Sequence, residues 1–216
     1  MEWLWRDRSG FPKRYLSLGI TAVRSCLRWL ANFHATFMGV EQKGLWEIGS
    51  YWNLATRPDE YASMAEGELK QAATELDRLL NNCVFKTLIH GDAKAENFCF
   101  SNNGKSVAAV DFQYVGGGCG IKDVAYFLGS CLDENQCNQW QDEMLDFYFA
   151  ELKNALDKKQ KQKQLDWGAL EKEWRTMFPI AWTDFYRFVA GWMPMHKKIN
   201  KYTRRLAEET FAVIKS

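Results

Sequence analysis

The side chains best suited to chemistry lie in one short stretch, residues 90–97, which has the sequence HGDAKAEN. This stretch supplies Asp92 and Asn97, and a further carboxylate, Asp111, follows in the sequence DFQ. Oxygen ligands of these types suit Mg²⁺, which takes one or two carboxylates and leaves other positions to phosphate and water. A site of this kind requires the three side chains to converge on one point.

A predicted β-hairpin separates Asn97 from Asp111. Asn103-Gly104 lies between the apolar runs FCFS and VAAVDF, and Asn-Gly in that setting predicts a two-residue turn. In a hairpin centred there, Asn97 faces Val110, so Asp111 returns to the end at which Asn97 lies. The residues alone leave one alternative, a polar turn whose Asp and Asn side chains cap local backbone groups.

Most of the remaining chain is predicted to be helical. Apolar residues at steps of three and four predict a helix over 20–38, ended by Gly39, and a second helix over 69–80. Further helices are expected along the stripe from Trp140 to Leu156 and over 170–178, 184–191 and 199–214, with a short strand at 86–89. The run DKKQKQKQ at 157–164 is expected to be a solvated linker. The glycines of 115–120 predict a flexible connector, with close passage of phosphate or substrate along the backbone as the alternative.

Composition excludes several classes of protein. The chain has 216 residues and a net charge of +1, so no overall field directs it to nucleic acid or to an anionic membrane. Its six Cys include no CxxC pair, and we expect reduced, mostly buried thiols in a cytoplasmic protein. No signal peptide is recognised, and no apolar run approaches the roughly 20 residues that cross a bilayer.

The stretch HGDAKAEN resembles the catalytic loop of the protein-kinase-like superfamily, which has the form H-x-D-x-K-x-x-N in protein kinases. Its His-Gly-Asp variant is similar to that of small-molecule kinases: aminoglycoside phosphotransferases, choline kinases and the ecdysteroid-kinase-like group. Asp111 in DFQ stands where DFG lies in protein kinases, and Asp123 with Ala125 resembles the Asp-x-Ala helix of this branch. The elements LANFHA, HGDAKAEN, DFQ and DVA occur in this order, so the resemblance spans roughly residues 20–132.

The resemblance implies an α+β, predominantly helical fold like the kinase C-terminal lobe, with a small β-hairpin carrying the catalytic loop. Asp92 is then the expected catalytic base, and Asn97 and Asp111 the expected ligands of Mg²⁺, which neutralises charge on the phosphoryl group of ATP. Lys94 is expected to contact the γ-phosphate, with a solvated lysine as the alternative. His90 is expected to hold the loop by hydrogen bonds.

Two further side chains receive structural roles. Asp123 is expected to brace the backbone of the catalytic loop from its helix. His34 lies on the apolar face of the first predicted helix, and we expect a buried core histidine with satisfied hydrogen bonds.

An N-terminal lobe that covers ATP is not recognised. Kinases of this superfamily supply a β-sheet lid, a strand Lys and a helix Glu from such a lobe, and no Gly-rich loop or V-A-I-K-like strand precedes the first predicted helix. Residues 1–14 resemble a hinge and the step into the large lobe, and Glu2 falls near the adenine-binding hinge. We expect one large-lobe domain over residues 1–216. A truncated product, a fragment of a longer parent chain and a lineage that lost its lid all stay open.

Three functions are compatible with these residues. The first is Mg-dependent transfer of the γ-phosphoryl group of ATP to a hydroxyl of a small-molecule acceptor. The second, favoured by the missing lobe, is a non-catalytic helical module that keeps the large-lobe fold and binds a partner or ligand. The third, a Mg-dependent phosphate-ester hydrolase, is weakened because no further Asp/Glu cluster offers a second metal site. No motif identifies the acceptor.

Overall fold

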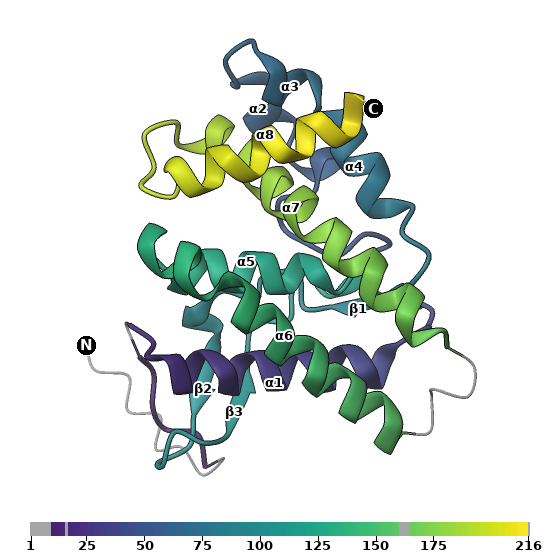
Figure 1. The fold of residues 1–216 in the computed structure, drawn as a ribbon, viewed down its shortest axis with the longest axis vertical. Helices are drawn as coiled ribbons and strands as arrows, with labels where there is room; N and C mark the ends of the chain where they lie inside the picture. The colour runs from purple at the N-terminus through teal and green to yellow at the C-terminus, as the bar shows by residue number, and fades with distance from the viewer. Residues whose placement is uncertain (1–9, 16, 160–164, 216) are drawn as a thin grey trace.

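Helices dominate the computed structural model of the chain, which describes residues 10–15, 17–159 and 165–215 (Figure 1). The helices are α1 (Ile20–Phe37), α2 (Pro58–Ala62), α3 (Glu68–Gln71), α4 (Ala73–Asn81), α5 (Ile121–Cys131), α6 (Glu134–Lys158), α7 (Trp167–Trp192) and α8 (Lys201–Lys215), with short 3-10 turns η1 (Leu54–Thr56) and η2 (Ala95–Asn97). The strands are β1 (Thr87–Ile89), β2 (Phe98–Phe100), β3 (Val107–Ala109) and β4 (Gly116–Gly118). The expected α+β, mostly helical class is confirmed.

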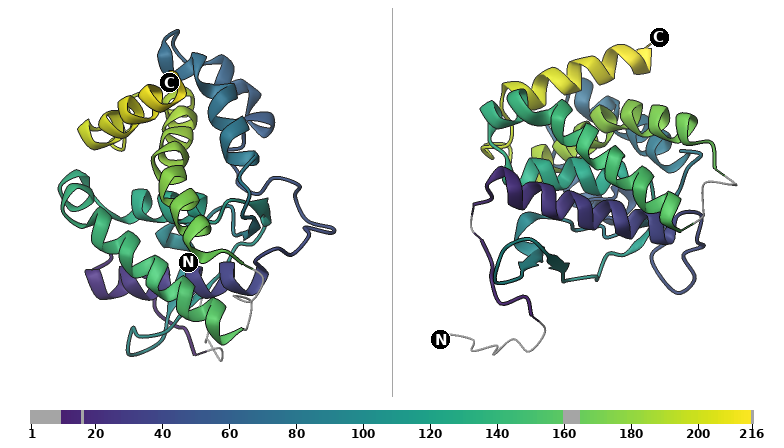
Figure 2. Two further views of the ribbon diagram at one scale, coloured as in Figure 1. Left: turned by 45° about the vertical axis from the view of Figure 1, so that its right-hand side comes forward. Right: turned by 60° about the horizontal axis from the view of Figure 1, so that its bottom comes forward.

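Buried side chains among the described residues form two hydrophobic clusters, and helix α1 belongs to the larger one. Its apolar residues at steps of three and four, including Val23, Leu27 and Leu30, are fully buried. Helix α6 runs beside α1, and the β2–β3 hairpin lies on the other side of α1 (Figure 2). Gly39 follows the helix with φ of 71°, a left-handed conformation that ends helices and that glycine adopts without strain. The predicted helix over 20–38 is therefore confirmed.

Three predicted helices differ from the observed ones. The expected helix over 69–80 is divided into α3 and α4 at Ala72. The expected separate helices over 170–178 and 184–191 form one helix, α7, which continues through Pro179. A proline inside a helix costs about 3 kcal/mol, and buried side chains such as Trp174 and Phe188 run along both halves of α7 and offset that cost.

The β2–β3 hairpin has the predicted register, since Phe98 pairs with Ala109 and Phe100 with Val107. Its turn differs from the prediction. A two-residue turn of that kind needs positive φ at both central residues, but of the pair only Gly104 has it, at 69°. Asn103 accepts hydrogen bonds through Oδ1 from the Lys105 backbone instead, which gives a longer loop with the same register.

The glycine run forms a strand, so the predicted flexible connector is wrong. Strand β4 pairs antiparallel with β1, and Gly116 also bridges Trp46 in a parallel pairing. A Cβ atom on Gly116 would lie 2.3 Å from the Trp46 carbonyl oxygen and 2.7 Å from the Gly49 nitrogen. The glycines therefore allow close packing of three backbone segments.

The two segments with expected special roles are only partly described. Of residues 1–14, the structure describes 10–14, where Lys13 pairs with Phe100 through both backbone groups; Glu2 lies outside the described residues. Of the expected linker 157–164, helix α6 includes residues up to Lys158, and 160–164 lie outside the described part. No helix within the described ranges is both long and apolar enough to span a bilayer.

Candidate active site

The predicted catalytic loop connects β1 to η2 and begins with a conformation that only glycine tolerates easily. Gly91 has φ of 79°, and a Cβ atom there would lie 2.2 Å from the Tyr114 carbonyl oxygen. The backbone N–H groups of His90 and Gly91 donate to the two carboxylate oxygens of Asp123, at 2.6 and 3.0 Å. Asp123, in the first turn of α5, thus holds the start of the loop in place.

Asp123 belongs to a chain of buried polar contacts that sequence reasoning recognised only in part. Its Oδ2 lies 3.1 Å from His34 Nε2, and His34 Nδ1 lies 2.8 Å from the Tyr148 hydroxyl. Burial raises the pKa of the Asp123 carboxyl, but the His34 and His90 contacts outweigh it and hold the pKa below its ordinary value. His34 is buried with satisfied hydrogen bonds, as expected, and it also connects α6 to the loop through Asp123.

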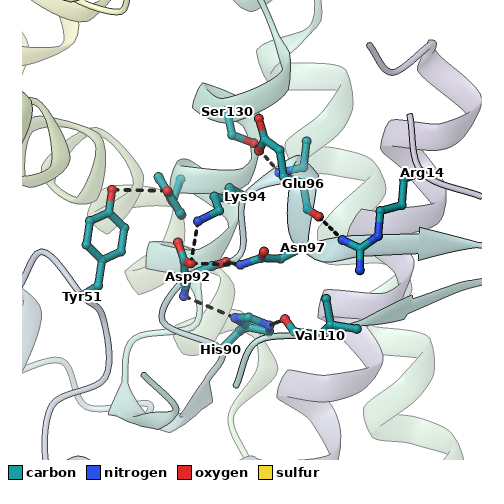
Figure 3. Close-up of polar contacts among 11 residues, drawn as sticks. Arg14, Tyr51, His90, Asp92, Lys94, Glu96, Asn97, Val110 and Ser130 are labelled. Carbon is teal, nitrogen blue, oxygen red and sulfur yellow. Dashed lines mark hydrogen bonds and ion pairs between the residues drawn. The ribbon is translucent and has the colours of Figure 1, made fainter. Parts of the chain in front are cut away.

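Asp92 is 2% exposed, and its two carboxylate oxygens have different surroundings (Figure 3). Oδ2 accepts hydrogen bonds from Lys94 Nζ and from Asn97 Nδ2, each at 2.9 Å. Asn97 Nδ2 also donates to the Asp92 carbonyl oxygen at 2.8 Å. Oδ1 is buried and has no hydrogen-bond partner at ordinary distance among the described residues, but the Tyr126 hydroxyl lies near the Asp92 carboxylate, since a side-chain hydrogen bond to Asp92 contributes to the raised pKa of Tyr126. The loop therefore fixes the carboxylate through one oxygen and leaves the other as an acceptor.

Lys94 and His90 stabilise the loop from opposite sides. Lys94 forms an ion pair with Asp92 while its side chain stays 36% exposed, so its ammonium group remains accessible. The buried His90 ring bridges the Asp92 backbone nitrogen at Nδ1, 3.3 Å, and the Val110 carbonyl oxygen at Nε2, 3.0 Å. These partners assign the neutral tautomer with hydrogen on Nε2, because a carbonyl oxygen only accepts and an amide N–H only donates.

Asp111 follows the end of β3 in a strained conformation. Its φ is 66°, which is uncommon outside glycine and is tolerated best by Asp and Asn. The residue before it is fixed on both sides, since the Val110 nitrogen donates to the Asn97 carbonyl oxygen at 2.9 Å and its own carbonyl accepts from His90. Asp111 itself is exposed. The backbone thus pairs the residue before Asp111 with Asn97 at the end of η2, while the metal-binding role of both side chains stays a prediction.

Two tyrosines that the sequence did not single out stand beside Asp92. Tyr126 in α5 donates a hydrogen bond to the Tyr51 hydroxyl at 3.3 Å, and the Tyr51 nitrogen donates to the Gly91 carbonyl oxygen at 3.1 Å. Burial raises the pKa of Tyr126, and the charges of Tyr51 and Asp92 raise it further. Burial also raises the pKa of Tyr51 to about 12. Both hydroxyls therefore remain protonated donors at neutral pH. The available signal was the position of Tyr126, three residues after Asp123.

Two hollows flank this arrangement. One, of about 410 Å³, is bounded by Ala95 and Glu96 of the loop, by the adjoining ends of α5 and α6, and by the segment between α7 and α8. The other, of about 390 Å³, lies beside Phe112 and Gln113 and faces Trp46. Small-molecule sites typically have volumes in this range.

Comparison with known families agrees with these features. The sequence model of the ecdysteroid kinase-like family matches residues 52–161, just over half of the 216-residue chain. The chain belongs to the ecdysteroid kinase-like family. The matched region contains the catalytic loop, Asp111 and Asp123, whereas His34 lies outside it. A search of curated proteins found no match.

Proposed function

We propose that this chain carries the catalytic machinery of a small-molecule kinase, which transfers the γ-phosphoryl group of ATP to a hydroxyl group. The observation that supports this most directly is the asymmetry of Asp92. Its Oδ2 is occupied by Lys94 and Asn97, whereas Oδ1 has no hydrogen bond of ordinary length in the described part of the chain and faces only the nearby Tyr126 hydroxyl. An oriented carboxylate oxygen of this kind suits a general base that accepts a proton from a hydroxyl.

The donor set fits Mg²⁺. Asn97 uses its Nδ2 for both hydrogen bonds to Asp92, so its Oδ1 is left for a cation. Asp111 is exposed and follows Val110, whose backbone nitrogen bonds to the Asn97 carbonyl oxygen. No cluster of three or more His, Cys, Asp or Glu side chains suited to a metal occurs among the described residues. One carboxylate and one carboxamide match a magnesium ion that completes its shell with phosphate oxygens and water, rather than an all-protein cage. Bound there, the ion would neutralise charge on the phosphates.

In this proposal each side chain has a separate role in the reaction. The acceptor oxygen bonds to the γ-phosphorus while the bond to the β,γ-bridging oxygen breaks, and ADP leaves. Asp92 Oδ1 takes the acceptor's proton as this happens. Lys94 offsets the Asp92 charge through their ion pair, and in this proposal it contacts the transferred group. His90 and Asp123 act on the backbone and keep Asp92 in position. A cytoplasmic location stays a prediction.

The competing hypothesis is a non-catalytic helical module that binds a ligand. One observation favours it: among the described residues 10–15 and 17–19, Lys13 bridges Phe100 and no strand covers the catalytic loop. The buried Asp92 carboxylate, held through one oxygen by Lys94 and Asn97, weighs against it, because burying a charged group is costly and a binding module gains nothing from that cost.

Measurement of products separates the hypotheses. The chain is incubated with millimolar Mg-ATP, with and without a panel of hydroxyl compounds, and ADP and inorganic phosphate are quantified together. A kinase forms ADP that depends on both Mg²⁺ and an acceptor, without equivalent free phosphate. A hydrolase releases phosphate regardless of the acceptor. Mg-ATP binding without any ADP would support the non-catalytic module and overturn the proposal.

A further inference from the structure

Four consecutive apolar residues at the end of α7 face solvent. Trp192, Met193, Pro194 and Met195 are all exposed, and Met195 is 94% exposed. They lie where the connection from α7 to α8 projects from the edge of the molecule (Figure 1). A run of three or four exposed apolar residues works against solubility and normally marks a binding surface. We call residues 192–195 the apolar tip, and we expect it to bind a partner.

The backbone of the apolar tip is largely hydrogen-bonded within the chain. The Met193 nitrogen donates to the Val189 carbonyl oxygen at 2.8 Å, and the His196 nitrogen donates to the Met193 carbonyl oxygen at 2.9 Å. Pro194 has no N–H group to satisfy. Because these groups do not depend on water, the tip can leave water at little cost in lost hydrogen bonds. The structure therefore holds a preformed apolar surface at this edge.

A basic segment follows the apolar tip directly. Residues 197–205 have the sequence KKINKYTRR, in which five of nine residues are Lys or Arg, and no Asp or Glu occurs in 190–207. The whole chain has 28 Lys and Arg against 27 Asp and Glu, so the balance outside this segment is acidic. The near-zero overall charge therefore conceals a basic segment that runs from the tip into the first turns of α8.

Three of the five basic side chains are available to an external charge. Within the described residues, Lys197, Lys201 and Arg204 form neither an ion pair nor a side-chain hydrogen bond, and all three are exposed. Of the other two, one lies half-buried over an aromatic ring and one pairs with a carboxylate. Two carboxylates at the start of α6 are held by backbone donors, since Asp133 caps its helix and Glu134 accepts from the Lys201 nitrogen at 3.4 Å.

An apolar tip beside unpaired basic side chains matches the surface of an anionic membrane. Tryptophan is enriched at the level of the lipid headgroups, and apolar side chains of interfacial segments are buried at the boundary between headgroups and acyl chains. Lys and Arg beside the tip are attracted to anionic headgroups. A nucleic acid would attract the same charges, but it offers the two methionines no apolar environment. The combination of both features therefore favours lipid.

We propose that the apolar tip, together with Lys197, Lys201 and Arg204, forms a docking surface for an anionic phospholipid membrane. The tip enters the headgroup region from one side, which is distinct from spanning the bilayer. This inference goes beyond the proposed function and does not depend on it, because docking requires neither ATP nor an acceptor.

Vesicle flotation tests the role of the apolar tip. The whole chain is mixed with vesicles of phosphatidylcholine, with or without phosphatidylserine, and we expect binding to the anionic vesicles that weakens as salt is raised. The double variant Met193→Ser, Met195→Ser should bind these vesicles about tenfold more weakly, because it removes apolar area that the membrane buries. Val84→Ser is the matched control, since Val84 is 78% exposed in the connection from α4 to β1, on the opposite side of the molecule (Figure 1). Brominated phosphatidylcholine in the vesicles should quench tryptophan fluorescence more in the wild type than in Trp192→Phe.

The role of the charges is tested separately. The double variant Lys197→Gln, Lys201→Gln should lower the affinity for anionic vesicles by about fivefold for each lysine. The double variant Lys158→Gln, Lys159→Gln removes the same charge from two exposed lysines at the end of α6, which lies away from the tip (Figure 1), and should change the affinity little.

Three results would overturn the proposal. The first is equal binding to neutral and anionic vesicles, or binding to neither. The second is a loss of affinity that is the same in a variant and in its matched control. The third is an oligomer that forms without vesicles and dissociates in Met193→Ser, Met195→Ser while vesicle binding is unchanged, because a second copy of the chain would then cover the tip. Failure of phosphoryl transfer leaves all of these measurements unaffected.

Discussion

His34 Nε2 lies 3.1 Å from Asp123 Oδ2, and neither side chain is exposed to solvent. This pair supports the catalytic loop, because the Asp123 carboxylate also accepts hydrogen bonds from the two backbone N–H groups at the start of the loop. The integrity of the candidate site therefore depends on a histidine in α1 that touches none of the reacting groups.

His34→Ala should destabilise the fold strongly. The change leaves the buried Asp123 carboxylate with one hydrogen-bond partner fewer, and such a loss typically costs about 1–3 kcal/mol, or more where the group left behind is charged. Urea unfolding at neutral pH measures the loss in free energy of unfolding. His196→Ala is the control, since His196 is only partly buried and should cost less than about 1 kcal/mol. Similar costs for the two variants would contradict the assigned role of His34.

The lowered pKa of Asp123 predicts that the stability of the fold depends on pH. Its pKa in the folded state lies below the ordinary value of 3.8, so its ionised form stabilises the fold. That contribution is complete above the unfolded-state pKa and is lost as pH falls through the folded-state pKa. We expect the free energy of unfolding to fall more steeply below about pH 4 in the wild type than in Asp123→Asn. Parallel profiles from matched urea titrations would show that Asp123 is not the group responsible.

Asp92→Asn and Asp111→Asn should differ in kind. The first removes the proton acceptor, and general-base catalysis typically contributes ~10²–10⁴-fold, so turnover should fall by that factor. Mg-nucleotide affinity should change less, because Asn97 and Asp111 are the proposed metal ligands. The second variant should weaken metal binding and turnover together. Rate measurements and Mg²⁺ titrations on both variants decide between these patterns, and intact turnover in Asp92→Asn would remove Asp92 from the role of base.

Gly91→Ala should destabilise the protein more than Gly104→Ala does. Both Gly91 and Gly104 have positive φ, at 79° and 69°, so alanine is strained at either position by about 1 kcal/mol or more. At Gly91 the new Cβ would also meet the Tyr114 carbonyl oxygen at 2.2 Å, whereas at Gly104 the nearest atom is 3.7 Å away. Thermal unfolding of the two variants should show that Gly91→Ala loses about 2 kcal/mol more free energy of unfolding than Gly104→Ala. Equal losses would mean that the loop shifts without cost.

The chain is expected to bind Mg-ATP weakly. Among the described residues before α1, Lys13 pairs with the hairpin and no strand supplies a lysine over the catalytic loop. The α- and β-phosphates would then lack the contacts that kinases of this type take from their N-terminal lobe. Calorimetric titration should give a dissociation constant near the millimolar range, roughly a thousand times weaker than micromolar. Micromolar affinity would show that the chain binds nucleotide tightly without those contacts.

The β2–β3 hairpin shows which structural features local sequence signals can predict. Asn103-Gly104 predicted the register of β2 and β3 correctly although the turn itself differs, because register depends on which residues face one another and a loop can be closed in several ways with the same pairing. The helical stripes of α1 and α6 were predictable for the same reason, since periodicity is a local property.

What sequence reasoning missed depends on contacts between distant segments. The pairing of β4 with β1 and the approach of Trp46 to Gly116 arise from tertiary packing, so the glycine run resembled a connector. Continuity of α7 through Pro179 likewise depends on buried side chains on both halves, which override a local helix breaker. Tyr51 comes near the catalytic loop only after the chain has folded, and no motif marks it.

The contact from His34 to Tyr148 spans 114 residues of sequence. At synthesis rates of about 5–20 residues per second, His34 would wait roughly 6 to 23 seconds for Tyr148 to be made. The Asp123 contact spans 89 residues, so that carboxylate also arrives well after the helix that receives it. Until these two residues are made, the His34 imidazole lacks its buried partners. During the same time α1 exposes the apolar face that α6 later covers. The nascent chain therefore presents an aggregation-prone helix for a period in which a chaperone has time to bind it.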